Sequence, residues 1–343
     1  MMMSNQTAAQ DHPASSLFLS CDWGTSSFRL RLIDVQRGEK LAETRRDVGV
    51  KSIYLQSVKE GVDRGDLFKN FLIRECQDML ESKGVKAASI RMMLSGMASS
   101  SIGWVDLPYA RMPFPLDGSG AIIQSRELLC HSGTVIECRL ISGVCSQDEM
   151  MRGEETELMG VFSLPSYRSL SGYCLAVVPG THSKHVLIRD GVMQSVQTYM
   201  TGELLEVLSR HSVLQATVDL KIVFEQKFKM IQDSQQESFK CGVLRAKQTG
   251  LLGGLFQART RGVLYSASAQ DNIWFLLGLL IGEELLQINR HHPEALPVLI
   301  AAGARFSELY RMAADHLETA GRLQFVDADD LDNASWLGQK VLI

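Results

Sequence analysis

The sequence predicts an α/β protein of two domains, each with a mixed sheet flanked by helices. Two observations carry this prediction. A segment with the order apolar strand, polar Gly-Thr-x-Ser turn and alternating strand occurs twice, near the start of the chain and near its middle. After each copy, apolar segments of helical period alternate with short apolar runs, as expected where helices and strands take turns. With 343 residues the chain has room for two domains with cores of their own.

The first copy of the repeated segment covers residues 17–33. Residues 17–19 form an apolar run, residues 28–33 alternate like a second strand, and only a tight turn fits between them. The turn offers a glycine without a Cβ, which lets a ligand approach the backbone, and then NH groups and hydroxyls that can converge on phosphate oxygens. The candidate residues are Asp22, Gly24, Thr25, Ser26 and Ser27. Asp22 can hold a hydrated Mg²⁺; an ordinary hairpin with a polar turn is the alternative.

The second copy covers residues 173–188. Its turn, Gly180-Thr181-His182-Ser183, aligns with residues 24–27 of the first copy. An Asp-Gly pair at residues 190–191 predicts a hairpin turn where the second strand ends. Two phosphate-type hairpins, one in each half, predict a duplicated fold that holds one nucleotide from both sides. Chance resemblance of two short turns is the alternative.

Composition excludes several classes of partner and environment. The net charge of −4 gives no electrostatic footprint for nucleic acid or an acidic membrane. Seven cysteines without a Cys-x-x-Cys pair favour reduced thiols over a disulfide or zinc framework. The longest apolar run, residues 273–281, is about half of what a bilayer requires. We therefore expect a soluble, cytoplasmic protein that binds neither nucleic acid nor membrane, with residues 1–16 as a disordered lead.

Further elements of the first half follow from apolar spacing. Expected are a strand at the sheet edge (40–46), a helix (67–80), a strand (90–94), a helix (120–131) and a strand (135–141). Residues 95–104 form a loop of small and hydroxylated residues after a strand end. We interpret this loop as one wall of a pocket for a polar substrate, with a flexible connection as the alternative.

The second half begins, by our prediction, near residues 142–148, where the pattern is interrupted. Residues 151–160 open a helix with three acids in its first turns, which the helix dipole alone would explain. Thr201 is the expected N-cap of the next helix. The remaining elements are expected to be long helices (239–265 and 270–289), a strand (296–300), a helix (306–317), a strand (323–326) and a last helix (330–342). Residues 301–305 leave room for a flat purine, although tight strand–helix packing explains them equally well.

Several short motifs in this order resemble the superfamily of actin, sugar kinases and heat-shock ATPases. Within it, the chain resembles the 2-dehydro-3-deoxygalactonokinase family. The resemblance rests on residues 22–26 with Arg29, 96–97 with 103–104, 151–156, 179–184, 200–204, 278–282 and 302–304 with Tyr310. Each motif is weak alone, but together they run in family order from about residue 17 to the C-terminus.

The resemblance implies two actin-like, ribonuclease H-like domains with the nucleotide in the cleft between them. The domains would be residues 17–145 and 146–343, and the last helix would pack back on the first domain. The implied activity is ATP-dependent phosphorylation of the C6 hydroxyl of 2-dehydro-3-deoxy-D-galactonate, with Mg²⁺, in sugar-acid catabolism. The expected partners are ATP and the sugar acid, and a homodimer is one option for the oligomeric state.

The resemblance also implies roles for particular residues. Glu154 lies ahead of the second phosphate loop, like the catalytic acid of related sugar kinases, and Glu155 is the second candidate. Expected at the nucleotide, besides the first turn, are Arg29, Gly180, Thr181, His182, Ser183, Lys184, Gly303 and Ala304. Expected at the sugar acid are Gly96, Met97, Ser100, Ser101, Gly103, Trp104, Arg152, Gly202 and Glu203.

Two other readings stay open. The chain can be a kinase for another sugar or keto-sugar acid, or a non-catalytic actin-like module that binds nucleotide. The Gly-Glu-Glu acids at residues 153–155 count against the second of these. A DNA-binding repressor of the same superfamily would need a helix-turn-helix at the N-terminus, which sixteen polar residues cannot supply.

Overall fold

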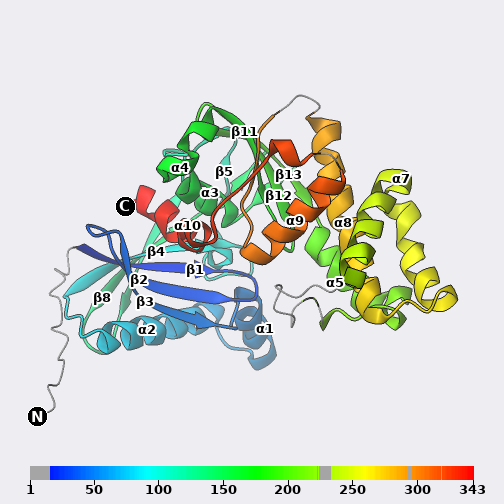
Figure 1. Cartoon of the computed structure of the whole chain (residues 1–343). Coiled ribbons are helices and arrows are strands. Elements are labelled where there is room, and N and C mark those ends of the chain that lie inside the picture. Colours follow the sequence, from blue (N-terminus) through cyan, green and yellow to red (C-terminus); the bar gives the residue numbers. More distant parts are fainter. Residues whose placement is uncertain (1–15, 222, 224–232, 293–295, 318) are drawn as a thin grey trace, which may run out of the picture.

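Two six-stranded sheets, with helices on their faces, organise the protein (Figure 1). The computed structural model describes residues 16–221, 223, 233–292, 296–317 and 319–343. Within that part of the chain, no helix is both long and apolar enough to cross a membrane. The expected lead, residues 1–16, lies outside the described residues except for Ser16.

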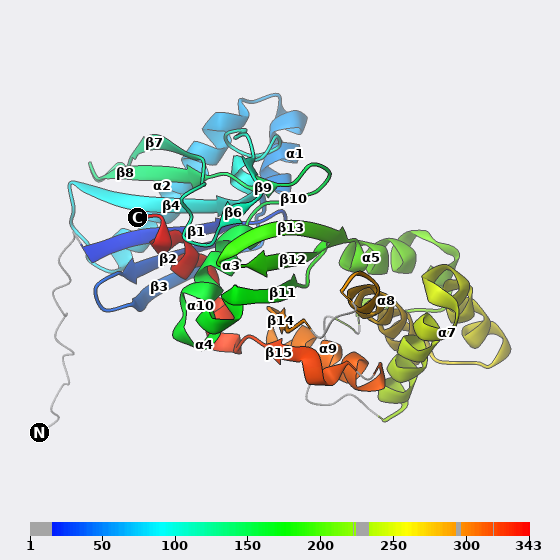
Figure 2. The same ribbon diagram turned by 90° about the horizontal axis from the view of Figure 1, so that it is seen from above.

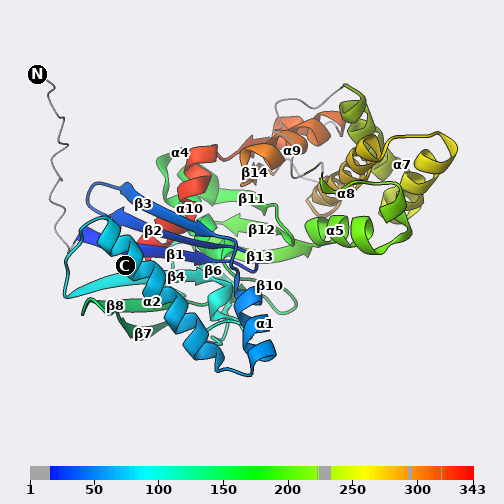
Figure 3. The same cartoon turned by 90° about the horizontal axis from the view of Figure 1, so that it is seen from below.

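The first sheet has the strand order β3-β2-β1-β4-β8-β7. Its strands are β1 (Leu17–Trp23), β2 (Phe28–Asp34), β3 (Glu39–Arg46), β4 (Ser89–Gly96), β7 (Ile123–Leu129) and β8 (Val135–Ile141). Helices α1 (Val50–Glu60) and α2 (Arg64–Ser82) cover one face, as Figure 3 shows. The core under them is centred on the rings of Trp23, Phe28 and Phe71, which contact one another with centroids 5.0–5.1 Å apart.

The second sheet has the order β15-β14-β11-β12-β13-β6. Its strands are β6 (Phe114–Pro115), β11 (Tyr173–Val178), β12 (Ser183–Arg189), β13 (Val192–Tyr199), β14 (Val298–Ile300) and β15 (Leu323–Phe325). The helices on one face are α5 (Thr201–His211), α7 (Asp233–Leu264), α8 (Ala269–His291) and α9 (Ala304–His316). Figure 2 shows α7 and α8 extending away from this sheet. Gly242 and Gly278 let these two helices touch, because a Cβ at either would overlap the other helix's backbone.

The two sheets repeat one topology. In each, the first strand pairs antiparallel with the second and parallel with the fourth, and the second pairs antiparallel with the third. The register also shifts at matching places, between Leu32 and Ile33 in β2 and between Leu187 and Ile188 in β12. The duplication predicted from the two hairpins therefore extends over five strands of each sheet, while the sixth strand lies at the β8 edge of the first sheet (β7) and at the β13 edge of the second (β6).

Two helices connect the halves. Helix α3 (Glu154–Ser163) contributes Leu158 and Phe162 to a core of the second sheet, and α10 (Ala328–Val341) places Trp336 in a core of the first sheet. The helices cross closely, because a Cβ on Gly160 would overlap the Ala334 carbonyl and one on Gly338 would overlap the Thr156 carbonyl. Each half is therefore held to the other through a tightly packed helix pair.

A small third sheet lies beside this connection. It consists of β5 (Ala110–Arg111), β9 (Val144–Cys145) and β10 (Met150–Met151). The boundary expected after residue 145 falls between β9 and β10 and stays a prediction. The remaining helix and 3₁₀ segments are α4 (Pro165–Arg168), η2 (Met97–Ser99), η3 (Ser169–Gly172), η4 (Val213–Ala216) and η6 (Ala320–Arg322).

The prediction of a helix over residues 120–131 is wrong. This segment contains β7, an edge strand paired antiparallel with β8 through a turn at Gly133, whose φ is 87°. Most of its side chains are exposed and only Leu128 is buried, so the alternation that marks a half-buried strand is missing. Pairing with β8, rather than local propensity, determines its conformation.

Other expectations need smaller corrections. Thr201 is the first residue of α5, not its N-cap; Met200 occupies that position without a side-chain cap. The long helix expected over residues 239–265 is broken at Gly250, where φ is 68° and ψ is 176°. Helix α1 has no counterpart among the predicted elements. The remaining predicted elements are confirmed with small shifts of their ends.

Candidate active site between the two halves

A cleft of about 490 Å³ lies where the ends of β1, β4 and β11 meet the start of α3. The first half contributes Asp22, Gly24, Thr25, Gly96, Met97 and Tyr109 to its lining. The second contributes the segment before and at the start of α3, including Arg152, Gly153, Glu154 and Glu157, and the second turn with Pro179, Gly180, Thr181, His182 and Lys184. Both Gly-Thr turns thus face the same space.

The first turn is held by its own backbone and by α1. The amide of Gly24 donates to the Ser27 carbonyl (2.9 Å), which closes the turn. The amides of Val50 and Lys51 donate to the carbonyls of Gly24 (3.0 Å) and Thr25 (3.2 Å). Gly24 and Thr25 line the cleft, whereas the adjacent Ser26 and Ser27 are exposed and lie outside its lining.

The second turn is held in a similar way by α5. The Glu203 amide donates to the Thr181 carbonyl (3.0 Å), and a Cβ on Gly202 would overlap the Gly180 carbonyl. The Glu203 carboxylate hydrogen-bonds the ring of His182. Gly202 and Glu203, expected at the sugar acid, therefore support the turn and do not line the cleft.

Ser183 and Lys184, which follow the second turn, face different environments. The Ser183 hydroxyl is fully buried and donates to the Glu284 carboxylate (2.6 Å), away from the cleft. The Lys184 ammonium donates to the Met150 carbonyl (2.9 Å) and the Thr198 hydroxyl (3.0 Å) while its side chain lines the cleft. Of these two residues only Lys184 has the position expected for contact with a phosphate.

The two adjacent acids at the start of α3 point in different directions. The Glu154 carboxylate lines the cleft and accepts from the Arg152 amide (2.9 Å). The Glu155 carboxyl turns inward and accepts from the Gly153 amide at 2.8 and 3.0 Å. Burial, with the nearby Glu154 carboxylate, raises the pKa of Glu155 to about 8. The geometry favours Glu154 as the group that meets a substrate.

Glu157 is a cleft residue that the sequence prediction did not include. Burial, followed by repulsion from the Asp22 carboxylate, raises its pKa to about 8. Burial also raises the pKa of Asp22, although the charges of Arg29 and Arg31 act in the opposite sense. The spacing of the acids could have identified Glu157 as a cleft residue, because a helical residue three positions after Glu154 lies on the same face of the helix.

The acids of the cleft fit a divalent cation. Asp22, Glu154 and Glu157 supply oxygen donors, and their mutual repulsion is the observation that a cation would relieve. Among the described residues, no group of three or more His, Cys, Asp or Glu side chains could hold a metal ion.

The loop after β4 shapes one wall of the cleft. Gly96 lines it with a φ of 90°, and a Cβ there would lie 2.7 Å from the Trp23 carbonyl. Met97 also lines the cleft, and the Ser100 hydroxyl donates back to the Met97 carbonyl (2.7 Å). The remaining candidates of the loop do not line the cleft: Ser101 is exposed, Gly103 packs on Ala98, and Trp104 packs on the first core.

Arg152 places a positive charge in the cleft wall. Its guanidinium is buried over the Tyr109 ring (4.1 Å from the centroid) and donates to the Ser99 hydroxyl (2.7 Å) and the Leu107 carbonyl (3.2 Å). Its Nε has no hydrogen-bond partner among the described residues. A buried cation bonded to neutral groups fits an anionic ligand.

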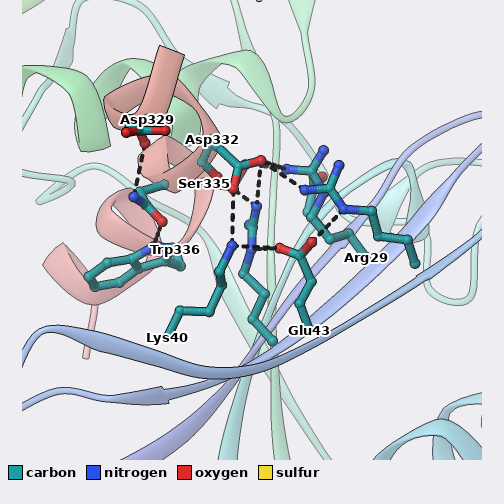
Figure 4. Close-up of polar contacts among 11 residues, drawn as sticks. Arg29, Lys40, Glu43, Asp329, Asp332, Ser335 and Trp336 are labelled. Carbon is teal, nitrogen blue, oxygen red and sulfur yellow. Dashed lines mark hydrogen bonds and ion pairs between the residues drawn. The ribbon is translucent and has the colours of Figure 1, made fainter. Parts of the chain in front are cut away.

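A second hollow, of about 320 Å³, adjoins the cleft and shares Glu157, Val178 and Pro179 with it. Gly303 and Ala304, expected near the adenosine, line it together with Arg29 and Asp332. The Arg29 guanidinium pairs with Asp332 of α10 (3.3 Å), as Figure 4 shows. The expected nucleotide residues other than Ser26, Ser27 and Ser183 are thus divided between two adjoining hollows.

Comparisons with known proteins agree on one family. A family model described as 2-keto-3-deoxy-galactonokinase matches residues 22–336. A probable 2-dehydro-3-deoxygalactonokinase of Rhizobium meliloti is 29% identical over 325 residues, which cover 91% of this chain and 93% of that protein. The 2-dehydro-3-deoxygalactonokinase of Escherichia coli is 28% identical over 303 residues, 86% of this chain and 88% of that protein.

A solved structure from Sinorhizobium meliloti, described as a candidate 2-dehydro-3-deoxygalactonokinase, has a similar fold. It is 26% identical in sequence and aligns with a TM-score of 0.72 over 94% of this chain and 96% of its own.

Proposed function

The chain belongs to the 2-keto-3-deoxy-galactonokinase family, and we propose that it transfers the γ-phosphoryl group of ATP to the C6 hydroxyl of 2-dehydro-3-deoxy-D-galactonate. The family resemblance inferred from the short motifs is confirmed by this membership. The observation that carries the proposal is that the family match, residues 22–336, includes both Gly-Thr turns and the acids at the start of α3. A homodimer and the absence of nucleic-acid partners stay predictions.

The nucleotide phosphates would lie between the two turns. Amides near Gly24 and Thr25, and near Gly180 and Thr181, would donate to phosphate oxygens, since both turns line the cleft. Lys184 would supply a positive charge at the same edge. Adenosine would occupy the adjoining hollow beside Gly303 and Ala304.

Magnesium would be held by Asp22, chiefly through water, with Glu154 and Glu157 nearby. When bound, the ion neutralises charge on the transferring phosphoryl group. The chain's own contribution is to keep these half-buried carboxyl groups together at the cleft, where their mutual repulsion favours a cation.

The sugar acid would lie along the wall formed by Gly96, Met97 and Arg152. Its carboxylate would pair with the positive charge of the Arg152 guanidinium, which lies buried in the cleft wall. The C6 hydroxyl, at the opposite end of the substrate, would then reach Glu154. Arg152 and Glu154 are two residues apart in the chain, and both line the cleft.

In the reaction, the C6 oxygen forms a bond to the γ-phosphorus while the bond from that phosphorus to the bridging oxygen of ATP breaks. Glu154 accepts the hydroxyl proton, and ADP leaves with the electron pair of the broken bond. General-base help of this kind contributes about 10²–10⁴-fold. Holding both substrates in line between the turns provides the rest through position and electrostatics.

The proposal is tested by comparing kcat/KM for the keto acid, its C4 epimer, glucose and galactose under saturating ATP. We expect the keto acid to exceed the two hexoses by at least a hundredfold, because neither hexose has a carboxylate for Arg152. If glucose or galactose is the better substrate by tenfold or more, the keto-acid assignment is wrong and only a sugar kinase remains. A preference for the C4 epimer would support a kinase for another keto-sugar acid.

A further inference from the structure

Beneath the second turn, four hydrogen-bonding side chains converge on one buried carboxylate, Glu284 of α8. The Ser183 hydroxyl (2.6 Å), the Tyr310 hydroxyl (2.7 Å) and the His185 Nε2 (3.0 Å) contact its Oε1, and the Thr201 hydroxyl donates to its Oε2. Glu284 is 2% exposed. No step of the proposed reaction uses this group.

These contacts join four separate elements. Ser183 and His185 belong to β12, Thr201 begins α5, Tyr310 lies in α9, and Glu284 itself belongs to α8. In Figure 2, β12 begins beside α5 and α8. A carboxylate at such a junction must be fully satisfied to be stable, and here each oxygen has a donor.

The carboxylate is held in its charged form. Burial acts to raise the pKa of Glu284, but hydrogen bonds from His185, Ser183 and Thr201 outweigh it and keep the pKa below the usual range. A charged acceptor binds its donors more strongly than a neutral one. The hydroxyls are therefore fixed firmly in place.

Two of the four donors border the second phosphate turn. Ser183 follows Gly180-Thr181-His182 directly, and so fixes the end at which the turn enters β12. Thr201 begins the helix whose Glu203 amide donates to the Thr181 carbonyl (3.0 Å). Glu284 thus fixes both the exit of the turn and the helix start that packs against it.

The first turn has no equivalent anchor at the matching position. Ser27, which aligns with Ser183 when Gly24 is placed on Gly180, is exposed. The first turn relies instead on the amides of Val50 and Lys51. Among the described residues, a buried carboxylate that accepts from the residue at this position of the turn is present in the second half and not in the first.

We propose that Glu284 is the positioning residue of the second phosphate turn, and that nucleotide affinity depends on its hydrogen bonds to Ser183 and Thr201. This inference rests on the proposed nucleotide site, in which Gly180 and Thr181 take phosphate oxygens. Glu284 touches neither substrate and acts only through the backbone that it holds.

The donors provide a sharper test than the carboxylate. Glu284→Ala would leave four groups without their acceptor and is expected to unfold the second half. We therefore compare Ser183→Ala and Thr201→Val, which each remove one hydroxyl next to the turn, with Thr201→Ser, which keeps the hydroxyl. Tyr310→Phe is the matched control, because it removes a hydrogen bond to the same carboxylate from an element outside the turn.

The measurement is the Kd for ATP by titration calorimetry, with thermal unfolding recorded for each variant. We expect Ser183→Ala and Thr201→Val to raise the Kd at least tenfold, and Thr201→Ser and Tyr310→Phe to stay within threefold of the wild type. If folded Ser183→Ala and Thr201→Val bind ATP within twofold of the wild type, the inference is overturned. The inference is also overturned if Tyr310→Phe raises the Kd for ATP as much as Ser183→Ala and Thr201→Val do, because Glu284 would then be a general structural support.

The measurement of ATP binding does not require the sugar-acid substrate. A failure of the keto-acid assignment would leave wild-type ATP binding intact and the comparison valid. Absence of ATP binding by the wild type would instead contradict the proposed nucleotide site, and the positioning role with it.

Discussion

At the scale of residues, the two adjacent acids at the start of α3, of which the sequence favours Glu154 over Glu155, point in different directions. Glu154 lines the cleft, whereas Glu155 turns inward to the Gly153 amide. The difference arises at the helix start, where Gly153 has a φ of 115° and lets the chain turn sharply into α3. The family resemblance favoured Glu154 through its spacing from the second turn, and the backbone geometry supports that choice by directing Glu154 into the cleft and Glu155 away from it.

The first prediction concerns these acids. Glu154→Gln is nearly isosteric and should lower kcat at least a hundredfold, with the KM for ATP changed less than threefold, because a proton acceptor is lost and not a binding group. Glu155→Gln is the matched control and should lower kcat less than tenfold, since a carboxyl with a pKa of about 8 is mostly neutral at pH 7. Steady-state kinetics of both variants test this assignment. If Glu155→Gln lowers kcat more than Glu154→Gln does, Glu155 is the general base.

The second prediction follows from the pKa of Glu155. Its ordinary value is 4.5 and its folded value about 8, so the folded protein keeps a proton that the unfolded chain releases between these pH values. Stability from this group is complete below pH 4.5 and is lost as the pH rises to about 8. In Glu155→Gln we expect the melting temperature to fall less steeply than in the wild type between pH 5 and 8. Parallel curves for the two proteins would contradict the assigned pKa.

At the scale of elements, α10 is fixed to the first sheet by an ion network (Figure 4). Asp332 pairs with Arg45 (2.9 Å), Lys40 (3.1 Å) and Arg29 (3.3 Å), and its carbonyl accepts from the buried Arg31 (2.6 Å). Residues 29–45 and Asp332 lie almost 300 positions apart in the chain. A pattern of local periodicity cannot reveal such a contact, which is why the sequence placed α10 but not its anchor.

The third prediction tests this network. Asp332→Asn should lower the free energy of unfolding by about 1–3 kcal/mol, because it removes charge-assisted hydrogen bonds and leaves Arg31 partly uncompensated. Urea unfolding measures the change, which should shrink in 1 M salt. Glu206→Gln is the control, since the Glu206–Arg210 pair is exposed on both sides and should matter little. Equal losses in the free energy of unfolding for the two substitutions would show that the network stabilises the protein no more than an exposed ion pair does.

The crossing of α3 and α10 gives the fourth prediction. Gly160→Ala should destabilise the protein by about 1–3 kcal/mol or more, because the added Cβ would overlap the Ala334 carbonyl and force the helices apart. Gly172→Ala is the control, since nothing lies within 4 Å of a Cβ there. Thermal unfolding of both variants tests the packing, and a Gly160→Ala protein as stable as the control would refute it.

The limits of sequence-based prediction are clearest in single elements. The two hairpins were predictable because each is a local pattern of strand, turn and strand. Residues 120–131 were not, because β7 is an edge strand with one buried residue, and only its partner β8 makes it a strand. The roles of Glu284 and Asp332 could not be predicted either, because both residues contact their hydrogen-bond and ion-pair partners only after elements distant in the sequence have packed together.

At the scale of the whole molecule, one sheet topology occurs twice and the cleft lies between the copies. The duplication places a Gly-Thr turn on each side of the cleft, and the close crossing of α3 and α10 fixes the halves to each other. The acids of the cleft come from two elements. Asp22 lies near the end of β1 in the first half, whereas Glu154 and Glu157 lie in the first turn of α3. A catalytic site of this kind needs both halves of the chain.

We propose that this cleft transfers a phosphoryl group from ATP to the terminal hydroxyl of the keto acid. The most direct test is ³¹P NMR of the products formed from ATP and 2-dehydro-3-deoxy-D-galactonate by the purified protein, with Glu154→Gln in parallel. We predict one phosphate monoester at C6, formed in equal amount to ADP, and at least a hundredfold less in the variant. Release of inorganic phosphate without the ester, or unchanged ester formation by Glu154→Gln, would contradict the claim.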